Sequence, residues 1–311
     1  MISAASATLH TRPARNSDLP FLDSLFTSFA ASSEKGFTYP ACENAQALLD
    51  ELRAYGLTLE EGMTIIEHAG EPIGCYGYLY EPKHLGDSAT STAAFLIGPL
   101  LVGPVRRYAS MPAILDTAES EAERRGLYAL RSCIAPANVG LADALTQHGW
   151  SLSARSLEMK LECGRDNWPG EPLGDIRVLQ SGSPRIVEAA KLLGDAFGWG
   201  EDAARRLQAY LDDKYEVVYA MQDSELCGVA IWYGVEPFAR IENIVVRSDR
   251  RRRGLGSLLL DAAVASLQSL GRETIYLALD PENAAARELY RQHGFVETQA
   301  SAVYVLDIRS R

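Results

Sequence analysis

The chain repeats itself at a constant offset of 145 positions. This offset aligns residues 106–161 with residues 251–306 without a gap, and it places Gln147-His148-Gly149-Trp150 on Gln292-His293-Gly294-Phe295. A unit of this length is too long for one turn of a solenoid, so we expect each copy to fold as a domain. With 311 residues, the chain is long enough to build two hydrophobic cores.

A segment without hydrophobic periodicity separates the two copies. Residues 162–174 read Glu-Cys-Gly-Arg-Asp-Asn-Trp-Pro-Gly-Glu-Pro-Leu-Gly, and this density of glycine and proline is typical of a linker. We therefore expect one domain over residues 1–162, a linker over residues 163–174 and a second domain over residues 175–311.

Each copy shows the same order of predicted elements. A short strand precedes two helices and three strands, and then come a helix, a strand, a helix and two strands. The first six ranges are 9–13, 21–29, 45–55, 63–68, 72–80 and 93–101 in the first copy, and 175–179, 185–197, 201–213, 215–221, 226–233 and 239–246 in the second. This order predicts an α+β fold, with helices flanking a mixed, mostly antiparallel sheet.

A glycine-bearing turn links the strand over residues 239–246 to the next helix, which is predicted over residues 254–270. The turn reads Arg251-Arg252-Arg253-Gly254-Leu255-Gly256-Ser257. Unpaired backbone N–H groups and the helix dipole favour a phosphate at such a helix start, and glycine lets the phosphate approach the backbone. The arginines would supply counter-charge for a diphosphate, and the alternative for them is a solvated basic turn.

This turn and the helix Asn283-Ala-Ala-Ala-Arg-Glu-Leu-Tyr290 together resemble the acyl-CoA-binding core of the GNAT superfamily of N-acyltransferases. The resemblance implies two tandem GNAT folds and acetyl-CoA as the co-substrate. It also implies that the pantetheine chain lies along the strand edge Ile244-Val245-Val246, where Asn283 hydrogen-bonds it. By the same resemblance, Tyr290 would protonate the departing thiolate, and the alternative is a partly buried helix tyrosine.

Glu242 is the candidate base for the acceptor amine. An amine with a pKa of about 10.4 is deprotonated in only about one molecule in a thousand at pH 7, so a carboxylate that removes its proton is useful. Glu242 shares one strand face with Arg240, and an ion pair between them is its alternative role. Family members place an acceptor-binding loop near the position of Trp199, so Trp199 is a candidate acceptor-binding residue, and its alternative is packing at a domain interface or in the core. Arg240 is the second candidate for binding the acceptor.

The first copy lacks most of these residues. Subtracting the offset places apolar residues at the positions of the two glycines, Arg240, Glu242 and Tyr290, namely Ala109, Met111, Phe95, Ile97 and Leu145. Only the asparagine is kept, as Asn138, together with the pair Arg106-Arg107. We therefore predict no transferase activity in residues 1–161, and either a structural role or CoA binding without reaction.

These residues predict an N-acetyltransferase that moves an acetyl group from acetyl-CoA to a small-molecule primary amine, by direct attack in a ternary complex. The alternatives are acetylation of protein amines and a non-catalytic acyl-CoA sensor. The tandem layout is similar to that of the mycothiol synthases, but Arg240 stands where they carry an acidic residue, so their substrate is not implied.

Composition excludes several other classes of protein. A net charge of −11 disfavours nucleic acid as a partner, and no uncharged apolar run is long enough to span a membrane. Five scattered cysteines without a C-x-x-C pair, and no recognisable signal peptide, predict a cytoplasmic protein. We found no cluster with metal-ligand spacing, so no metal is expected, and the oligomeric state is left open.

Overall fold

A computed structural model gives the structure of the chain, and it describes residues 9–32, 37–40, 42–80, 92–102, 111–163, 175–179, 182–213, 215–234 and 239–310. The chain forms two compact units, residues 1–155 with 300–311 and residues 156–299, which we call the first and second units. The predicted turn residues Arg106, Arg107 and Ala109 and the linker residues 164–174 lie outside the described residues.

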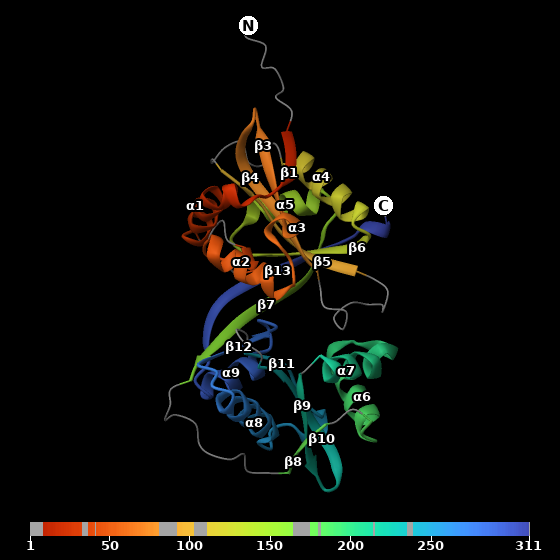
Figure 1. The fold of residues 1–311 in the computed structure, drawn as a ribbon. Helices are drawn as coiled ribbons and strands as arrows, with labels where there is room; N and C mark the ends of the chain where they lie inside the picture. The colour runs from red at the N-terminus through yellow and green to blue at the C-terminus, as the bar shows by residue number, and fades with distance from the viewer. Residues whose placement is uncertain are drawn as a thin grey trace. The chain divides into compact units, whose positions relative to one another are not determined.

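The first unit is a mixed sheet with helices packed on both faces (Figure 1). Its strand order is β1-β3-β4-β5-β6-β13, with β2 also paired to β6, and of the described pairs β5 with β6 is parallel. Adjacent strand residues face opposite sides, so Ile65 packs in the cluster of α1 and α2 while Ile66 packs in that of α4. The elements are β1 (Leu9–Pro13), α1 (Leu19–Ala30), β2 (Phe37–Tyr39), α2 (Ala45–Ala54), α3 (Leu59–Gly62), β3 (Met63–His68), β4 (Glu71–Tyr80), β5 (Thr92–Leu101), α4 (Met111–Arg124), β6 (Leu127–Ile134), α5 (Val139–Gln147) and the end of β13 (Val296–Asp307).

The second unit repeats this plan. Its strand order is β7-β12-β11-β10-β9-β8, and β11 with β12 is the parallel pair. The helices α8 and α9 flank the sheet on one side and α6 and α7 on the other (Figure 1). The elements are most of β7 (Ser151–Glu162), β8 (Ile176–Val178), α6 (Ile186–Phe197), α7 (Ala203–Asp212), β9 (Glu216–Gln222), β10 (Glu225–Tyr233), β11 (Arg240–Val246), α8 (Leu255–Ser269), β12 (Thr274–Leu279) and α9 (Ala284–Gln292).

The predicted α+β class and the mostly antiparallel, mixed sheet are confirmed. The repeat is visible in the elements, because α5 and α9, and likewise β7 and β13, begin and end 145 positions apart. None of the helices in the described ranges is long and apolar enough to cross a membrane.

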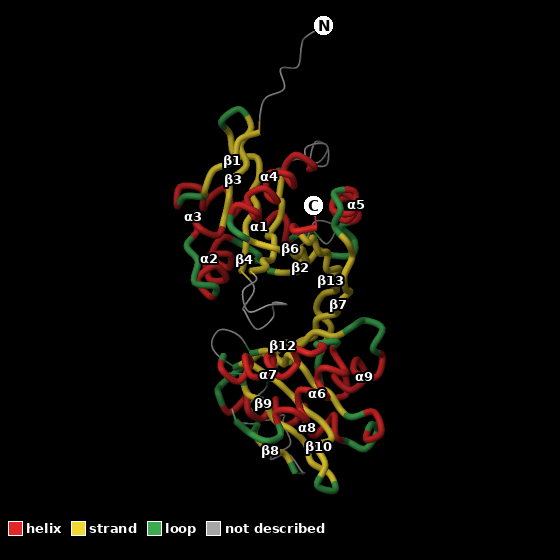
Figure 2. The backbone as a smooth tube through the Cα atoms, turned by 90° about the vertical axis from the view of Figure 1, so that its right-hand side faces the viewer, coloured by secondary structure: helices red, strands yellow, loops and turns green. Residues whose placement is uncertain are grey.

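The two units differ from the predicted ranges because the last strands are exchanged between the copies. β7 comes from the first copy but pairs β12 of the second unit, from Leu157 opposite Leu279 to Glu162 opposite Thr274. In the reciprocal pairing, β13 lies beside β6 of the first unit, from Ala302 opposite Ile134 to Asp307 opposite Ala129 (Figure 2). Residues 156–162 therefore belong to the second unit and residues 300–311 to the first.

Each exchanged strand contributes side chains to the core it joins. Leu157, Met159 and Leu161 alternate along β7 and pack in the core of the second unit. Leu306 of β13 packs in a core of the first unit and is 3% exposed. The strand therefore supplies both ladder hydrogen bonds and apolar burial to a sheet built from the other copy.

This exchange predicts where core substitutions are felt. Leu306→Ala should cost about 2–5 kcal/mol by leaving a cavity, and it should speed hydrogen exchange in β6 of the first unit. Leu161→Ala, at the equivalent position, should speed exchange in β12 of the second unit instead. Peptide-resolved hydrogen–deuterium exchange measures both effects, with the exposed Val296→Ala as control. If Leu306→Ala instead speeds hydrogen exchange in β12 and not in β6, β13 does not pack in the first unit, and the proposed swap of strands is wrong.

Candidate active site

The strands β11 and β12 are paired at only one end. Arg240 pairs with Tyr276 and Ile241 with Leu277, and in the described part of the chain β11 continues beyond Ile241 with β10 as its single strand partner. The predicted pantetheine edge, Ile244-Val245-Val246, lies wholly in this stretch without a β12 partner. Its backbone could pair with an extended ligand much as a strand would.

The turn before α8 adopts the geometry of an open helix start. Gly254 is the N-cap, with φ of 82° and no side-chain cap, so the first N–H groups of Leu255, Gly256 and Ser257 have no capping side chain. A side chain at Gly254 would meet no atom within 4 Å, but it would be strained in this left-handed conformation. These amides are available to an anion at the positive end of the helix dipole.

Gly256 has a packing role that the sequence did not reveal. A Cβ atom there would lie 3.3 Å from the side chain of Leu289 on α9, so glycine allows α8 and α9 to approach closely. At the equivalent positions of the first unit, Met111 and Ala144 belong to one hydrophobic cluster. A large residue on one helix is thus matched by a small one on the other in both units. The side chain of Met111 is buried in the core of the first unit.

The three arginines of the turn are exposed and differ in their contacts. Arg251 donates from Nε to the Val246 carbonyl at 3.0 Å, which leaves its terminal nitrogens for a ligand. Arg252 and Arg253 make no hydrogen bond or ion pair with any residue that the structure describes. Arg250, by contrast, is bound to Asp223 and Glu225. The geometry therefore leaves positive charge at the open helix start.

Asn283 and Tyr290 lie at the two ends of α9. The Asn283 Oδ1 atom caps the helix by accepting from the Ala286 N–H at 3.1 Å, and Asn138 caps α5 in the same way at 3.3 Å. The retention of Asn138 is thus explained by helix capping. The Asn283 amide NH2 is left to donate to a ligand. Tyr290 is 8% exposed in the core beneath α8, and burial raises its pKa to about 12.

Glu242 occupies an irregularity in β11. Ile231 of β10 lies opposite Asn243 and Trp232 opposite Ile241, so Glu242 is the extra residue of a β-bulge. Its Oε1 lies 3.6 Å from Arg240 Nε, and its side chain is 26% exposed. The predicted ion pair with Arg240 is therefore present, and it is long. Bulges re-aim side chains next to reactive sites, which is compatible with either role of Glu242.

A row of aromatic side chains lies beside Glu242 on the face of α7. Trp199 stacks on Tyr210 at 5.9 Å between ring centroids, and Tyr210 contacts Tyr215, which contacts Tyr233, each at 4.8 Å. Burial raises the pKa values of Tyr210 and Tyr215 above their ordinary values, and the negative charge of Glu242 raises both further. Trp199 is thus the end of a row of packed rings, two of which respond to the charge of the candidate base.

The corresponding region of the first unit is filled by protein. β5 and β6 are parallel and paired as far as Phe95 opposite Arg131, but β2 pairs the far end of β6, with Tyr39 opposite Cys133. The Tyr39 ring packs on Phe95 at 4.7 Å. Ile97 and Leu145, at the positions of Glu242 and Tyr290, are buried in hydrophobic clusters. The short strand β2 was not predicted.

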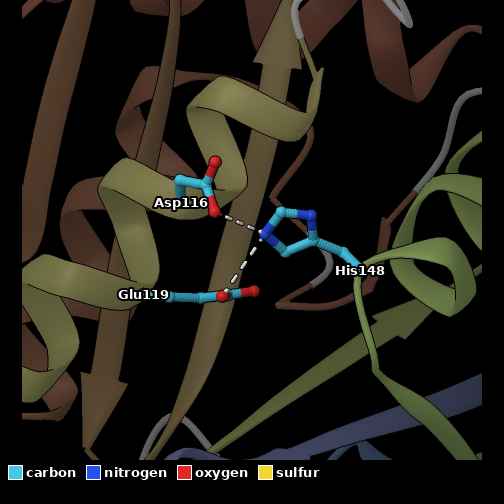
Figure 3. Close-up of side chains that lie close together, drawn as sticks. All are labelled: Asp116, Glu119 and His148. Carbon is cyan, nitrogen blue, oxygen red and sulfur yellow. Dashed lines mark ion pairs between the residues drawn. The ribbon is translucent and has the colours of Figure 1, made fainter. Parts of the chain in front are cut away.

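A cluster of Asp116, Glu119 and His148 escaped prediction because its members come from two separate helices (Figure 3). His148 Nε2 lies 3.0 Å from Asp116 and 3.5 Å from Glu119, which accepts from Trp150 Nε1 at 2.8 Å. Three such ligand atoms could hold a metal ion. The same histidine–aspartate pair recurs in the second unit, however, between His293 and Asp261 at 3.4 Å. Its recurrence favours a structural role for both histidines, in which each ties two helices together.

Known proteins resemble this chain in sequence and in fold. Residues 186–295 match the model of the acetyltransferase (GNAT) family. The ribosomal protein bS18-alanine N-acetyltransferases of Salmonella typhimurium and Escherichia coli are 34% and 33% identical over 102 residues, which are 33% of this chain and 67% of theirs.

Two solved structures share the fold over nearly the whole chain. A GCN5-related N-acetyltransferase from Sphaerobacter thermophilus has a TM-score of 0.67 and 15% identity, covering 96% of both chains. A tandem GNAT protein from the clavulanic acid biosynthesis pathway has a TM-score of 0.56 and 16% identity, covering 97% of this chain and 99% of that one. The chain therefore belongs to the GNAT family of acetyltransferases, which use acetyl-CoA as their co-substrate.

Proposed function

We propose that the second unit transfers the acetyl group of acetyl-CoA to the primary amine of a small molecule. The observation that carries this proposal is the separation of β11 from β12 after Ile241, because it leaves a place for the thioester between two groups suited to proton transfer. Tyr290 packs with α8 on one side of the sheet, while Glu242 lies beside Tyr210 of α7 on the other.

The coenzyme would bind with its phosphates at the open start of α8. Arg251, Arg252 and Arg253 would neutralise the phosphates, and the amides of Leu255, Gly256 and Ser257 would bind them. The pantetheine chain would then follow Ile244, Val245 and Val246, with Asn283 donating to it. This path leads from the start of α8 towards the gap between β11 and β12.

The acetyl transfer would proceed by direct attack. The amine nitrogen forms a bond to the thioester carbon, the carbon–sulfur bond breaks, and CoA leaves as its thiolate. Tyr290 supplies a proton to this thiolate, and Glu242 accepts the proton that the amine nitrogen loses. Because burial raises the pKa of Tyr290 to about 12, its phenol holds that proton at neutral pH.

The acceptor would lie on the face of Glu242, where Trp199 and Arg240 are near. Tyr210, Tyr215 and Tyr233 form a row of closely packed rings, which would suit a compact amine as acceptor. A second candidate is the N-terminal amine of a protein, because the relatives from Salmonella typhimurium and Escherichia coli acetylate an alanine of ribosomal protein bS18.

We propose that the first unit does not transfer acetyl groups. The equivalents of Glu242 and Tyr290 are the buried, apolar Ile97 and Leu145. In the first unit β2 pairs with β6 beyond the last β5–β6 pair, and this supports the same conclusion because β6 is not open there. A structural role follows for this unit.

Thiol release from acetyl-CoA tests the function directly. The full chain should release free CoA with some members of a panel of small primary amines, and more slowly with a peptide that begins with alanine. Glu242→Gln should lower kcat by about 10²–10⁴-fold, because the amine then loses its base. Tight acetyl-CoA binding by calorimetry, without turnover of any amine or peptide, would instead establish the sensor alternative. Faster reaction with the peptide would favour the protein acceptor.

The arginines of the turn should determine coenzyme affinity. Arg252→Ala with Arg253→Ala should weaken acetyl-CoA binding by at least about tenfold, because two charge-assisted contacts to phosphate are lost. The matched control is Arg106→Ala with Arg107→Ala in the first copy, where the affinity should not change. Calorimetry measures both double variants. A loss of affinity in the control alone would move the coenzyme to the first unit.

Tyr290 should act as an acid without titrating in the assay range. Tyr290→Phe should lower kcat by about 10²-fold while acetyl-CoA still binds. Since the pKa of Tyr290 is raised to about 12, its phenol stays protonated from pH 6 to 10, and the wild type should lose no activity there through Tyr290. A basic limb below pH 10 that Tyr290→Phe abolishes would contradict this role, and Tyr304→Phe serves as control.

A further inference from the structure

The exchanged strand β7 brings a charged residue to the face of the second unit that carries Glu242. Leu157, Met159 and Leu161 point into the core, so the alternate residue Glu158 points away from it. The Glu158 Oε1 atom accepts from the Thr298 hydroxyl at 3.0 Å and faces the Gln299 amide at 3.5 Å. Its other oxygen is directed to Arg240.

Arg240 lies between two carboxylates and is bound tightly by neither. Its Nη1 is 3.7 Å from Glu158 Oε2, and its Nε is 3.6 Å from Glu242 Oε1. Within the described residues, Arg240 makes no hydrogen bond through its side chain. Other pairs of this unit are much closer, since Arg287 donates to Glu297 twice at 2.7 Å and Arg247 donates to Asp249 at 2.7 and 2.9 Å.

The three charges occur together in one unit and are absent together from the other. Adding or subtracting the offset of 145 places Val303, Phe95 and Ile97 at the positions of Glu158, Arg240 and Glu242. Val303 lies on β13, the strand that the first unit receives in exchange. At all three positions the second unit therefore has a charged residue and the first unit has an apolar one. This joint difference indicates that the three charges act as a set.

We propose that Glu158 is a positioning residue for the candidate base Glu242, acting through Arg240. A guanidinium that closed onto Glu242 with two short hydrogen bonds would stabilise the ionised carboxylate and weaken it as a proton acceptor. Glu158, fixed by Thr298, attracts Arg240 from the other side and holds it midway. Glu242 is then kept in place yet is free to take the proton of the amine.

This inference rests on the proposed function, and it gives the first copy a part in it. By sequence, Glu158 belongs to the first copy, whereas Arg240 and Glu242 belong to the second. The charge set of the second unit is thus completed by the exchanged strand. The second copy alone, residues 175–311, does not contain it.

The test compares two substitutions on the same strand of the full chain. Glu158→Gln removes the charge, whereas its amide can still accept from Thr298. It should lower kcat about tenfold with little change in the KM for acetyl-CoA. The acidic limb of the kcat–pH profile should move to lower pH, because Arg240 then pairs with Glu242 alone. Glu162→Gln is the matched control, since Glu162 likewise faces outward and accepts from the Thr274 hydroxyl at 2.8 Å.

A double-mutant cycle identifies the route of the effect. In an Arg240→Gln background, Glu158→Gln should have no further effect on kcat or on the pH profile. The inference would be overturned if Glu158→Gln and Glu162→Gln both had the kinetics of the wild type while Glu242→Gln was inactive. The proposed function would still stand in that case. An unchanged effect in the Arg240→Gln background would also overturn it. A wild type without turnover would overturn both the inference and the proposed function.

Discussion

The early separation of β11 from β12 is the constraint on which the second unit depends. In the described part of the chain these two parallel strands share two residue pairs, and the rest of the β11 edge on that side has no strand partner there. Buried backbone polar groups need partners, so such an edge is stable when solvent or an extended ligand can reach it. The same gap lies between Tyr290, packed on the side of α8, and Glu242, on the side of α7. In the proposed function, this single irregularity in the sheet would supply both the binding edge and access from two faces.

In the first unit the two equivalent strands, β5 and β6, also separate, but another strand of the chain pairs beyond that point. β5 and β6 also part after Phe95, but β2 pairs with β6 and Tyr39 packs on Phe95. Among the described residues, β2 thus pairs with the part of β6 that corresponds to the end of β12 beyond its last pair with β11. Ile97 and Leu145 of the first unit are buried and apolar. This is consistent with a filled gap, because burial in the core stabilises an apolar side chain that has no ligand beside it. The first unit therefore differs from the second at this gap by the short strand β2 and by the buried, apolar Ile97 and Leu145.

Much of the fold could be predicted from the repeat, because the offset alone places α9 on α5 and β13 on β7. The open helix start could be predicted as well, since Gly254 adopts the left-handed conformation that glycine favours. The exchange of β7 and β13 could not be predicted from the sequence. Both strands have the same alternation of apolar residues, so the pattern does not show which sheet each strand joins. Local motifs also conceal second roles. Asn138 is explained by capping, and Gly256 by its approach to Leu289, and neither contact is visible in spacing.

The exchange makes the second unit depend on the first copy, whether or not that copy has chemistry of its own. β12 has one strand edge beside β11 and the other beside β7, so loss of the first copy would remove a central partner and expose a row of unpaired backbone groups. It would also remove Leu157, Met159 and Leu161 from the core of the second unit. These residues tie the two copies together through hydrogen bonds and apolar burial, independently of any ligand.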